Sequence, residues 1–345
     1  MKNNCGDIHN IIVEENYMTR TKALAPDAVL KTYWRNSHRL ADLYNQAFFN
    51  GEERILPENL TELDTDESGM QLEHRTISAV TKIRDLIKQC DSEVGLFLIS
   101  LENQMATHFA MPVRSMLMDA WRYTRQCQEI ENAHREAKDL NGSDEFLSGM
   151  TAEDRIRAVM TLVVYYGEKA WSGPDCLWDM MDIPDMIKPY VNNYDIHVLQ
   201  ARDGDQYDFK NQDNKDFFML ISELYENKGN FRLEDFEKKH PGMRVYWETA
   251  AAVGAATGTT KLMNYALKYK GEDLNMCTAL QGLIDEGHRE GRIEGHRQGV
   301  QETRNEDIIT MVRVLRSLNI PDKKIALKLH EEYAMTKKEI HKYLN

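Results

Sequence analysis

The segment spanning residues 96–125 constrains the fold of this chain more than any other part of the sequence. It begins within the run Val94–Leu101, in which nearly every position is apolar. Because strand side chains alternate between two faces, such a run predicts a strand buried on both sides in the middle of a sheet. Pro112 then stands where a helix can begin, since its fixed φ suits the first helical turn. A buried strand leading into a long helix predicts an α/β protein.

The remaining periodicities predict further helices and strands around this segment. We expect helices where apolar residues recur at helical spacing, and strands where apolar runs are short. The expected helices span residues 27–49, 72–89, 214–226 and 244–270, and the further strands span 156–166 and 194–199, with a short strand ending near Asp64. In the long helix after Pro112, the stripe expected to face the core consists of Met116, Leu117, Ala120, Tyr123, Cys127 and Ile130.

The last part of the chain differs in kind, because glycine recurs every four residues from Gly287 to Gly299. Each glycine costs roughly 1 kcal/mol against alanine in a helix, so the repeat indicates close helix–helix approach or a flexible hinge. The predicted organisation is a tail over residues 1–24, one domain over 25–275 and a helical extension over 276–345. Met18 is an alternative to Met1 as the start.

Composition excludes several classes of protein. The net charge of −13 argues against broad non-specific binding to nucleic acid, which leaves local basic patches or a bound metal as the means of contact. No apolar run reaches the roughly 18–20 residues that a membrane span needs. Five dispersed cysteines without a CxxC pair favour a reducing compartment, and no secretory signal is visible, so we expect a cytoplasmic protein.

Polar residues follow the central predicted strand directly. Glu102 and Gln104 are two positions apart, so their side chains should leave the same face of the sheet. Asp64 should end a neighbouring short strand, although Asp66 can replace it. An Asp and a Glu at adjacent strand ends form a hard-oxygen site that suits Mg²⁺ or Mn²⁺. The alternative is that these are solvated polar residues at strand ends, with Asp64 capping a turn.

The run LISLENQMATHFAMPVRSMLMDAWRY, with LADLYNQAFF and PENLTELDTDESG upstream, resembles the recombination-promoting nuclease/putative transposase family. That family belongs to the PD-(D/E)XK nuclease superfamily. The resemblance extends to DRIRAVMTLVVYYGEKAWSGP and the Glu-Gly repeat. It implies a restriction-endonuclease-like mixed sheet flanked by helices, and metal-dependent cleavage of DNA at the strand ends, associated with recombination or transposition.

The resemblance also implies roles for particular residues. Asp64 matches the metal-binding acid, Glu102 matches the second acid, and Gln104 stands where the superfamily usually has lysine. Asp42 falls where an acid of an N-terminal helix can complete the site, and Arg114 falls where it can contact phosphate or orient Glu102. Because Gln104 is uncharged, it can orient a water but cannot stabilise negative charge as lysine would.

Basic residues outside this motif are candidates for contact with DNA. Arg122 and Arg125 lie on the long helix, where the alternative is a solvated face. The end of the chain resembles a small helix-turn-helix, for which a small helical bundle is the alternative. Its candidate phosphate contacts are Lys323, Lys324, Lys328, Lys337 and Lys338.

Two functions follow from these expectations. The first is a Mg²⁺- or Mn²⁺-dependent DNA endonuclease, and the second is a nuclease-fold scaffold that binds DNA with weak or no catalysis. A further expected partner is a second copy of the chain, bound through the glycine-repeat helix. For Arg114 and Glu102, the alternative to roles in the site is a structural ion pair between the two side chains.

Overall fold

The computed structural model describes residues 25–63, 86–226 and 231–344, and it divides the chain into two compact units, Met1–Ala279 and Leu280–Asn345. A five-stranded mixed sheet in the order β1-β2-β3-β4-β5 forms the centre of the first unit. β1 to β3 are antiparallel, whereas β4 runs parallel to β3 and β5 runs parallel to β4. The strands are β1 Leu60–Glu62, β2 Leu86–Ser92, β3 Gly95–Gln104, β4 Val159–Tyr165 and β5 His197–Gln200.

The hairpin of β2 and β3 corrects one sequence prediction. The sequence predicts a helix over residues 72–89, but Leu86 to Gln89 belong to β2, which pairs with β3 from Leu86↔Leu101 to Ser92↔Gly95. Residues 64–85 lie outside the described part of the chain. Leu86 and Ile87 are adjacent and both buried, because the two faces of this strand are both covered. Two adjacent apolar residues fit a helical stripe as well as they fit a strand buried on both faces. Pairing with β3 therefore decided that these residues form a strand.

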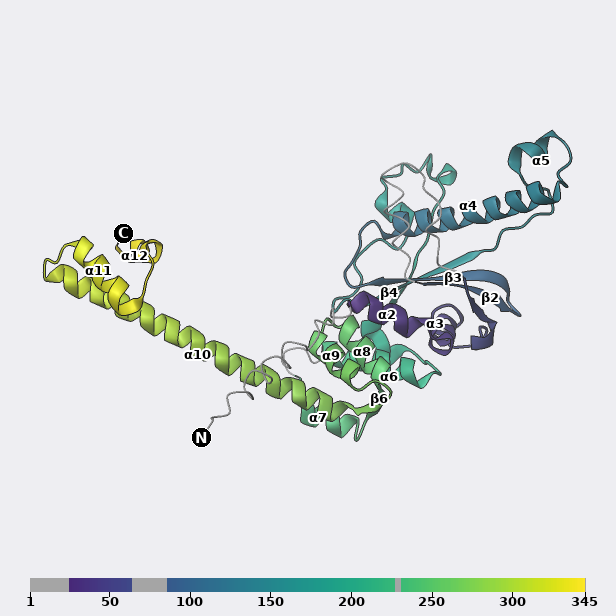
Figure 1. Cartoon of the computed structure of the whole chain (residues 1–345). Coiled ribbons are helices and arrows are strands. Elements are labelled where there is room, and N and C mark those ends of the chain that lie inside the picture. The colour runs from purple at the N-terminus through teal and green to yellow at the C-terminus, as the bar shows by residue number, and fades with distance from the viewer. Residues whose placement is uncertain (1–24, 64–85, 227–230, 345) are drawn as a thin grey trace, which may run out of the picture. The chain divides into compact units, whose positions relative to one another are not determined.

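Helices cover the two faces of the sheet (Figure 1). The long helix α4 (Met111–Ala137) lies on one face, and α2 (Pro26–Arg35), α3 (Ser37–Phe49) and α6 (Gln212–Glu226) lie on the other. The prediction of a mixed α/β fold with a sheet flanked by helices is therefore confirmed. The predicted strand over residues 156–166 is β4, and the one over 194–199 is the shorter β5.

The remaining elements of the first unit are mostly short. α8 (Trp247–Ala256) and α9 (Thr260–Lys268) pack against each other and, with α2 and α6, form the lower helical layer. The other elements are η1 Pro57–Asn59, α5 Ser143–Ser148, η2 Leu177–Met180, η3 Lys188–Tyr190, η4 Ala201–Gln206, α7 Leu233–Lys239, β6 Arg244–Tyr246 and β7 Asp273–Asn275.

Two predicted helices are each divided by a local signal. The helix expected over residues 27–49 breaks at Asn36, whose Oδ1 accepts hydrogen bonds from the backbone N–H groups of His38 and Arg39. This is an N-cap, which satisfies donors that a continuing helix would have used differently. The helix expected over 244–270 begins instead with β6 and is interrupted at Gly258, which has a positive φ of 69°.

The face by which α4 packs on the sheet differs from the predicted stripe, and that prediction was wrong. Leu117 is 50% exposed. Four of the seven buried positions are polar, and none of the seven belongs to the predicted stripe: Met111, Pro112, Ser115, Met118, Asp119, Arg122 and Gln126. A polar helix face is buried because the sheet beneath it also presents polar groups, including Ser100 and Thr161, and Thr161 hydrogen-bonds to the helix.

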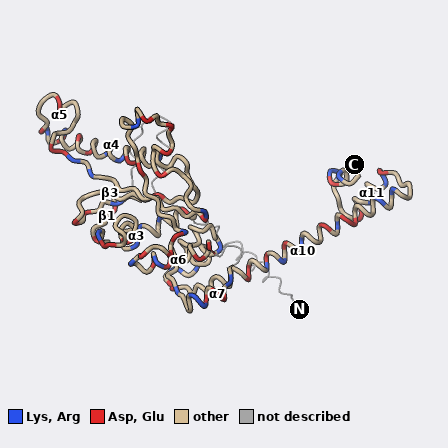
Figure 2. The backbone as a smooth tube through the Cα atoms, turned by 180° about the vertical axis from the view of Figure 1, so that it is seen from behind, with Lys and Arg blue, Asp and Glu red and all other residues tan. Residues whose placement is uncertain are grey.

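The second unit contains most of α10 (Met276–Ser317), which begins in the first unit, together with α11 (Asp322–Tyr333) and α12 (Lys337–Leu344). Both signs of charge are interleaved along α10 (Figure 2). The hydrophobic core of this unit consists of Ile308, Val312, Ile325, Leu329, Met335 and Ile340. Three amphipathic stretches therefore bury one common cluster. Within the described residues, no helix is long and apolar enough to cross a membrane.

Candidate functional site

Glu102 and Gln104 lie at the end of β3, on the face of the sheet that α4 covers. In the parallel register of β3 and β4, Glu102 is beside Val163 and Gln104 is beside Tyr165. The Glu102 side chain is fully buried, whereas Gln104 is half-buried. Strand alternation thus places both polar side chains between the sheet and the first turns of α4, as their spacing predicted.

Arg114 reaches from α4 to the Glu102 carboxylate. Its Nη2 lies 3.2 Å from Glu102 Oε2, and the arginine side chain is 28% exposed. A guanidinium that reaches from the helix to a buried carboxylate fixes the orientation of that carboxylate and offsets the cost of burying its charge. This contact fits both the orienting role expected for Arg114 and the structural ion pair that was its alternative.

The other two predicted acids do not join Glu102 in the described structure. Asp64, like its alternative Asp66, lies outside the described residues. Asp42 on α3 turns toward α6: its Oδ1 accepts a hydrogen bond from the backbone N–H of Lys210 at 2.7 Å, and its Oδ2 accepts one from Asn214 Nδ2 at 2.8 Å. Burial raises the pKa of the Asp42 carboxyl. Asp42 therefore connects two helices on the opposite side of the sheet from α4.

Asp119 is an acid that sequence reasoning missed. It is 4% exposed on the sheet-facing side of α4, where Oδ1 accepts a hydrogen bond from Thr161 Oγ1 at 2.8 Å and Oδ2 accepts one from Tyr194. A cavity of about 320 Å³ opens beside it, between α4 and the ends of β4 and β5. No sequence signal identified Asp119, because the predicted apolar stripe did not include it.

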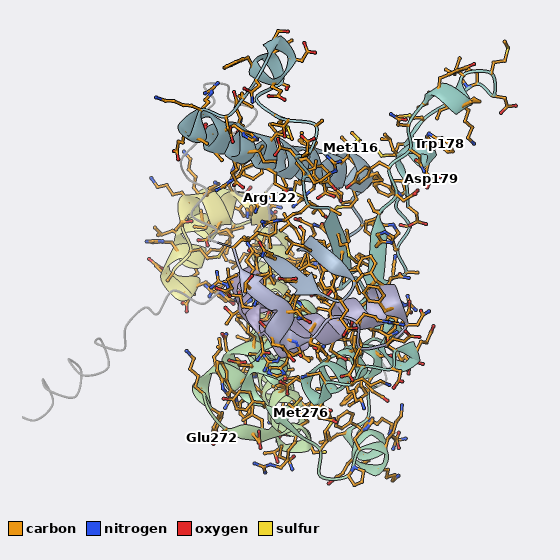
Figure 3. All side chains as sticks on the ribbon, turned by 90° about the vertical axis from the view of Figure 1, so that its right-hand side faces the viewer. Met116, Arg122, Trp178, Asp179, Glu272 and Met276 are labelled. Atoms are coloured by element: carbon orange, nitrogen blue, oxygen red, sulfur yellow. The ribbon has the colours of Figure 1, made fainter. Side chains whose placement is uncertain are left out.

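Arg122 and Arg125 lie nearer the middle of α4 and line a second cavity of about 440 Å³. Arg122 is only 6% exposed, so the alternative of a solvated face does not describe it, and Figure 3 shows it beneath α4, between the helix and the sheet. Arg155 and Arg157 line the same cavity. These two arginines were missed; they lie in the segment that leads into β4.

The five lysines predicted to contact DNA are exposed on α11 and α12 of the second unit. The buried Ile325, Leu329 and Ile340 of the same two helices belong to the hydrophobic core of that unit. The glycines of the repeat lie in α10, and a Cβ built at each of Gly287, Gly291, Gly295 and Gly299 meets nothing within 4 Å. The close helix approach that the repeat indicated is therefore not made by any described segment of this chain.

The donor set for a divalent cation is incomplete in the described part of the chain. No group of three His, Cys, Asp or Glu side chains gathers there in a way that could hold a metal ion. Glu102 provides one carboxylate, and Arg114 already contacts it. Glu102 is therefore the one predicted acid that the described part of the chain places at this strand end.

Comparison of the whole chain with protein-family models, with curated proteins and with solved structures finds no match.

A pH-sensitive clamp connects α4 to the chain that leads into β4. His134 Nδ1 lies 2.7 Å from Asp139 Oδ1, and Nε2 lies 2.9 Å from Asp154 Oδ2. The hydrogen bonds to Asp139 and Asp154 raise the pKa of His134 above its usual 6.5. The protonated imidazole is favoured in the folded state, so its stabilisation is fully present below pH 6.5 and is lost as pH rises through the higher folded-state pKa.

We expect the urea midpoint of the first unit to fall as pH rises above 6.5, and to fall less in the His134→Gln variant. The exposed His38 provides the matched control, because His38→Gln removes an imidazole that is not in this clamp. Urea titrations followed by circular dichroism at several pH values measure the effect. Equal pH dependence in wild type and His134→Gln would contradict the clamp.

Proposed function

We propose that this chain is a metal-dependent DNA endonuclease with a restriction-endonuclease-like core, acting in recombination or transposition. The observation that supports this most is the position of Glu102 and Gln104, which share one face at the end of β3 in a mixed sheet flanked by helices. A buried carboxylate and a half-buried amide at a strand end, beside an arginine, are groups that phosphodiester hydrolysis can use.

In this proposal Glu102 and Asp64 hold Mg²⁺ or Mn²⁺, since hard cations prefer carboxylate oxygens. A cation held there would supply positive charge that stabilises the negative charge developing on the phosphodiester. Gln104 orients the attacking water by hydrogen bonding. Arg114 keeps the Glu102 carboxylate directed toward the first turns of α4, and the arginine side chain, which is 28% exposed, would offer hydrogen-bond donors to a phosphate oxygen.

A non-catalytic DNA-binding scaffold is the second candidate, and two observations favour it. Arg114 already neutralises Glu102, and Gln104 brings no positive charge to the strand end. Lys88 does not replace the missing lysine, because β2 directs it to the opposite face, where its Nζ donates to the Arg35 carbonyl at 2.7 Å. Burial lowers the pKa of Lys88.

The test is nicking of supercoiled plasmid DNA by the full chain with Mg²⁺ or Mn²⁺, and with EDTA. The Glu102→Gln variant keeps the size of the side chain and an acceptor for Arg114, but it loses the charge that binds a cation. We expect nicking to fall at least about a hundredfold, because several kcal/mol of charge stabilisation is removed. Glu93→Gln, at the exposed turn between β2 and β3, is the matched control and should nick as wild type does.

Separate variants identify the second acid. Asp64, Asp66 and Asp85 all precede β2 outside the described residues, and Asp85 stands directly before Leu86 in the sequence. Each of the three is replaced by asparagine in a separate variant. We expect Asp64→Asn to abolish nicking, and the other two variants to retain it. If wild type does not nick DNA with either metal, or if Glu102→Gln nicks equally well, the endonuclease proposal is wrong and the scaffold remains.

A further inference from the structure

Four arginines surround the cavity of about 440 Å³ between α4 and the segment that leads into β4. We call it the arginine pocket, and it lies within the first unit. Leu98 of β3, which is 1% exposed, is among the residues that line it. The full lining is Leu63, Leu98, Arg122, Arg125, Gln126, Glu129, Ile130, Ala133, Arg155 and Arg157. It thus has apolar walls and a concentration of guanidinium groups.

Two elements deliver the arginines from opposite sides. Arg122 and Arg125 are three residues apart on α4 and therefore share a helix face. Arg155 and Arg157 are exposed on the segment before β4. The buried Gln126 fastens that segment to the helix, because its Oε1 accepts from the backbone N–H of Arg157 at 2.7 Å and its Nε2 donates to the Arg157 carbonyl at 3.1 Å. The two pairs of arginines are held together by this double hydrogen bond.

The charge of the pocket is opposite to that of the chain. Among the described residues, its lining carries four arginines and one acid, Glu129, whereas the whole chain has a net charge of −13. Arg155 donates to the backbone carbonyls of Ala152 and Asp154, and Arg157 donates to the Gln89 side-chain oxygen. These acceptors are neutral, and neither arginine forms an ion pair within the described residues. Their positive charge therefore remains available to an anion.

We infer that the arginine pocket binds a backbone phosphate of DNA, on the same face of the sheet as Glu102. This inference rests on the proposed function, which supplies DNA as the ligand. Arg114 and Arg122 are eight residues apart on α4, or about 12 Å along the helix axis. A DNA strand carries one charge per about 3.4 Å of axis, so a phosphate in the pocket would lie about three to four nucleotides from one beside Glu102. Guanidinium groups suit this role because they bind phosphate oxygens bidentately.

The test measures binding of a short fluorescein-labelled DNA duplex to the full chain by anisotropy, in EDTA and over a range of salt concentrations. EDTA removes the metal that cleavage would need, so this experiment measures binding alone. A failure of the nuclease proposal is therefore distinguishable from a failure of this inference. The double variant Arg155→Gln/Arg157→Gln changes two exposed side chains and should preserve the fold, which circular dichroism checks. Arg135→Gln, at a 68% exposed position on the same helix and outside the pocket, is the matched control.

We expect the double variant to bind at least about tenfold more weakly, since even one hydrogen bond to a charged group is worth about this factor. The slope of log K against log salt concentration should fall by about 1 for each phosphate that the variant no longer neutralises. Arg135→Gln should bind as wild type does. Glu129→Gln removes an acid of the pocket, which pairs with Arg125 at 3.0 Å, and should bind more tightly.

Three results would overturn the inference. The first is wild-type affinity and salt slope in the double variant. The second is absence of duplex binding by wild type at low salt. The third is stabilisation of wild type against heat by inorganic phosphate, abolished in the double variant, with no binding of the duplex: the pocket would then be a site for a small free anion.

Discussion

Replacement of Trp34 by alanine is expected to lower the free energy of unfolding of the first unit by about 3–5 kcal/mol. The indole is fully buried where α2 meets α6, and its ring centroid lies 5.6 Å from that of Phe217 and 6.2 Å from that of Phe218. Removing it leaves a cavity that these packed rings fill only in part. Denaturation by urea, followed by circular dichroism, measures the loss.

Trp34 also begins a hydrogen-bond chain that reaches the site strand. Its Nε1 donates to the Tyr166 hydroxyl at 2.8 Å, and that hydroxyl donates to Asn103 Oδ1 at 2.7 Å. Asn103 stands between Glu102 and Gln104 on the other face of β3. Trp34→Phe keeps most of the apolar surface but loses the indole donor, so we expect it to cost about 1–3 kcal/mol.

Leu147 is the control for this series, because it is 91% exposed on α5. Leu147→Ala should change stability by less than about 0.5 kcal/mol. If Trp34→Ala destabilised no more than Leu147→Ala does, the aromatic cluster would not be the packed core that its burial indicates.

Substitution of Gly254 by alanine is expected to destabilise the first unit by about 1–3 kcal/mol or more, even though alanine is the better helix former. Gly254 lies in α8 where α9 passes closely, and a Cβ placed there would be 2.9 Å from Met263 Cα. That atom belongs to the backbone, so no rotation of a side chain relieves the clash. The two helices would have to move apart, which disturbs the buried alanines of α8.

Gly291 in α10 is the matched glycine for this comparison. A Cβ there meets nothing within 4 Å, so Gly291→Ala should stabilise its helix by about 1 kcal/mol through helix propensity alone. Thermal unfolding of both variants, followed by circular dichroism, measures whether each substitution raises or lowers stability. A stabilising Gly254→Ala would show that α8 and α9 are not closely packed.

The elements predicted best from sequence are those whose pattern is local. The β3 strand and the start of α4 near Pro112 follow from an apolar run and from a residue with a fixed φ, and both are confirmed. α6 and α11 follow from helical spacing in the same way. The placement of Glu102 and Gln104 on one face also follows, because alternation along a strand needs no knowledge of distant residues.

The elements predicted worst are those whose conformation depends on a distant partner. Leu86 to Gln89 form a strand because β3 is there to pair with them, and nothing within those residues distinguishes a strand from a helical stripe. The buried side of α4 was misjudged for the same reason. An amphipathic pattern assumes an apolar surface beneath the helix, whereas this sheet presents Thr161 to Asp119.

The amino-acid sequence by itself determined the strand that ends in Glu102 and Gln104, and the helix that follows it, since both are consequences of short-range periodicity. Only the tertiary structure decided what these residues meet: Arg114 contacts Glu102, Asp42 turns away to α6, and Arg155 and Arg157 come to face Arg122 and Arg125. The physical reason is that backbone conformation depends on near neighbours in the chain, whereas contacts between side chains depend on how strands and helices from distant segments pack together.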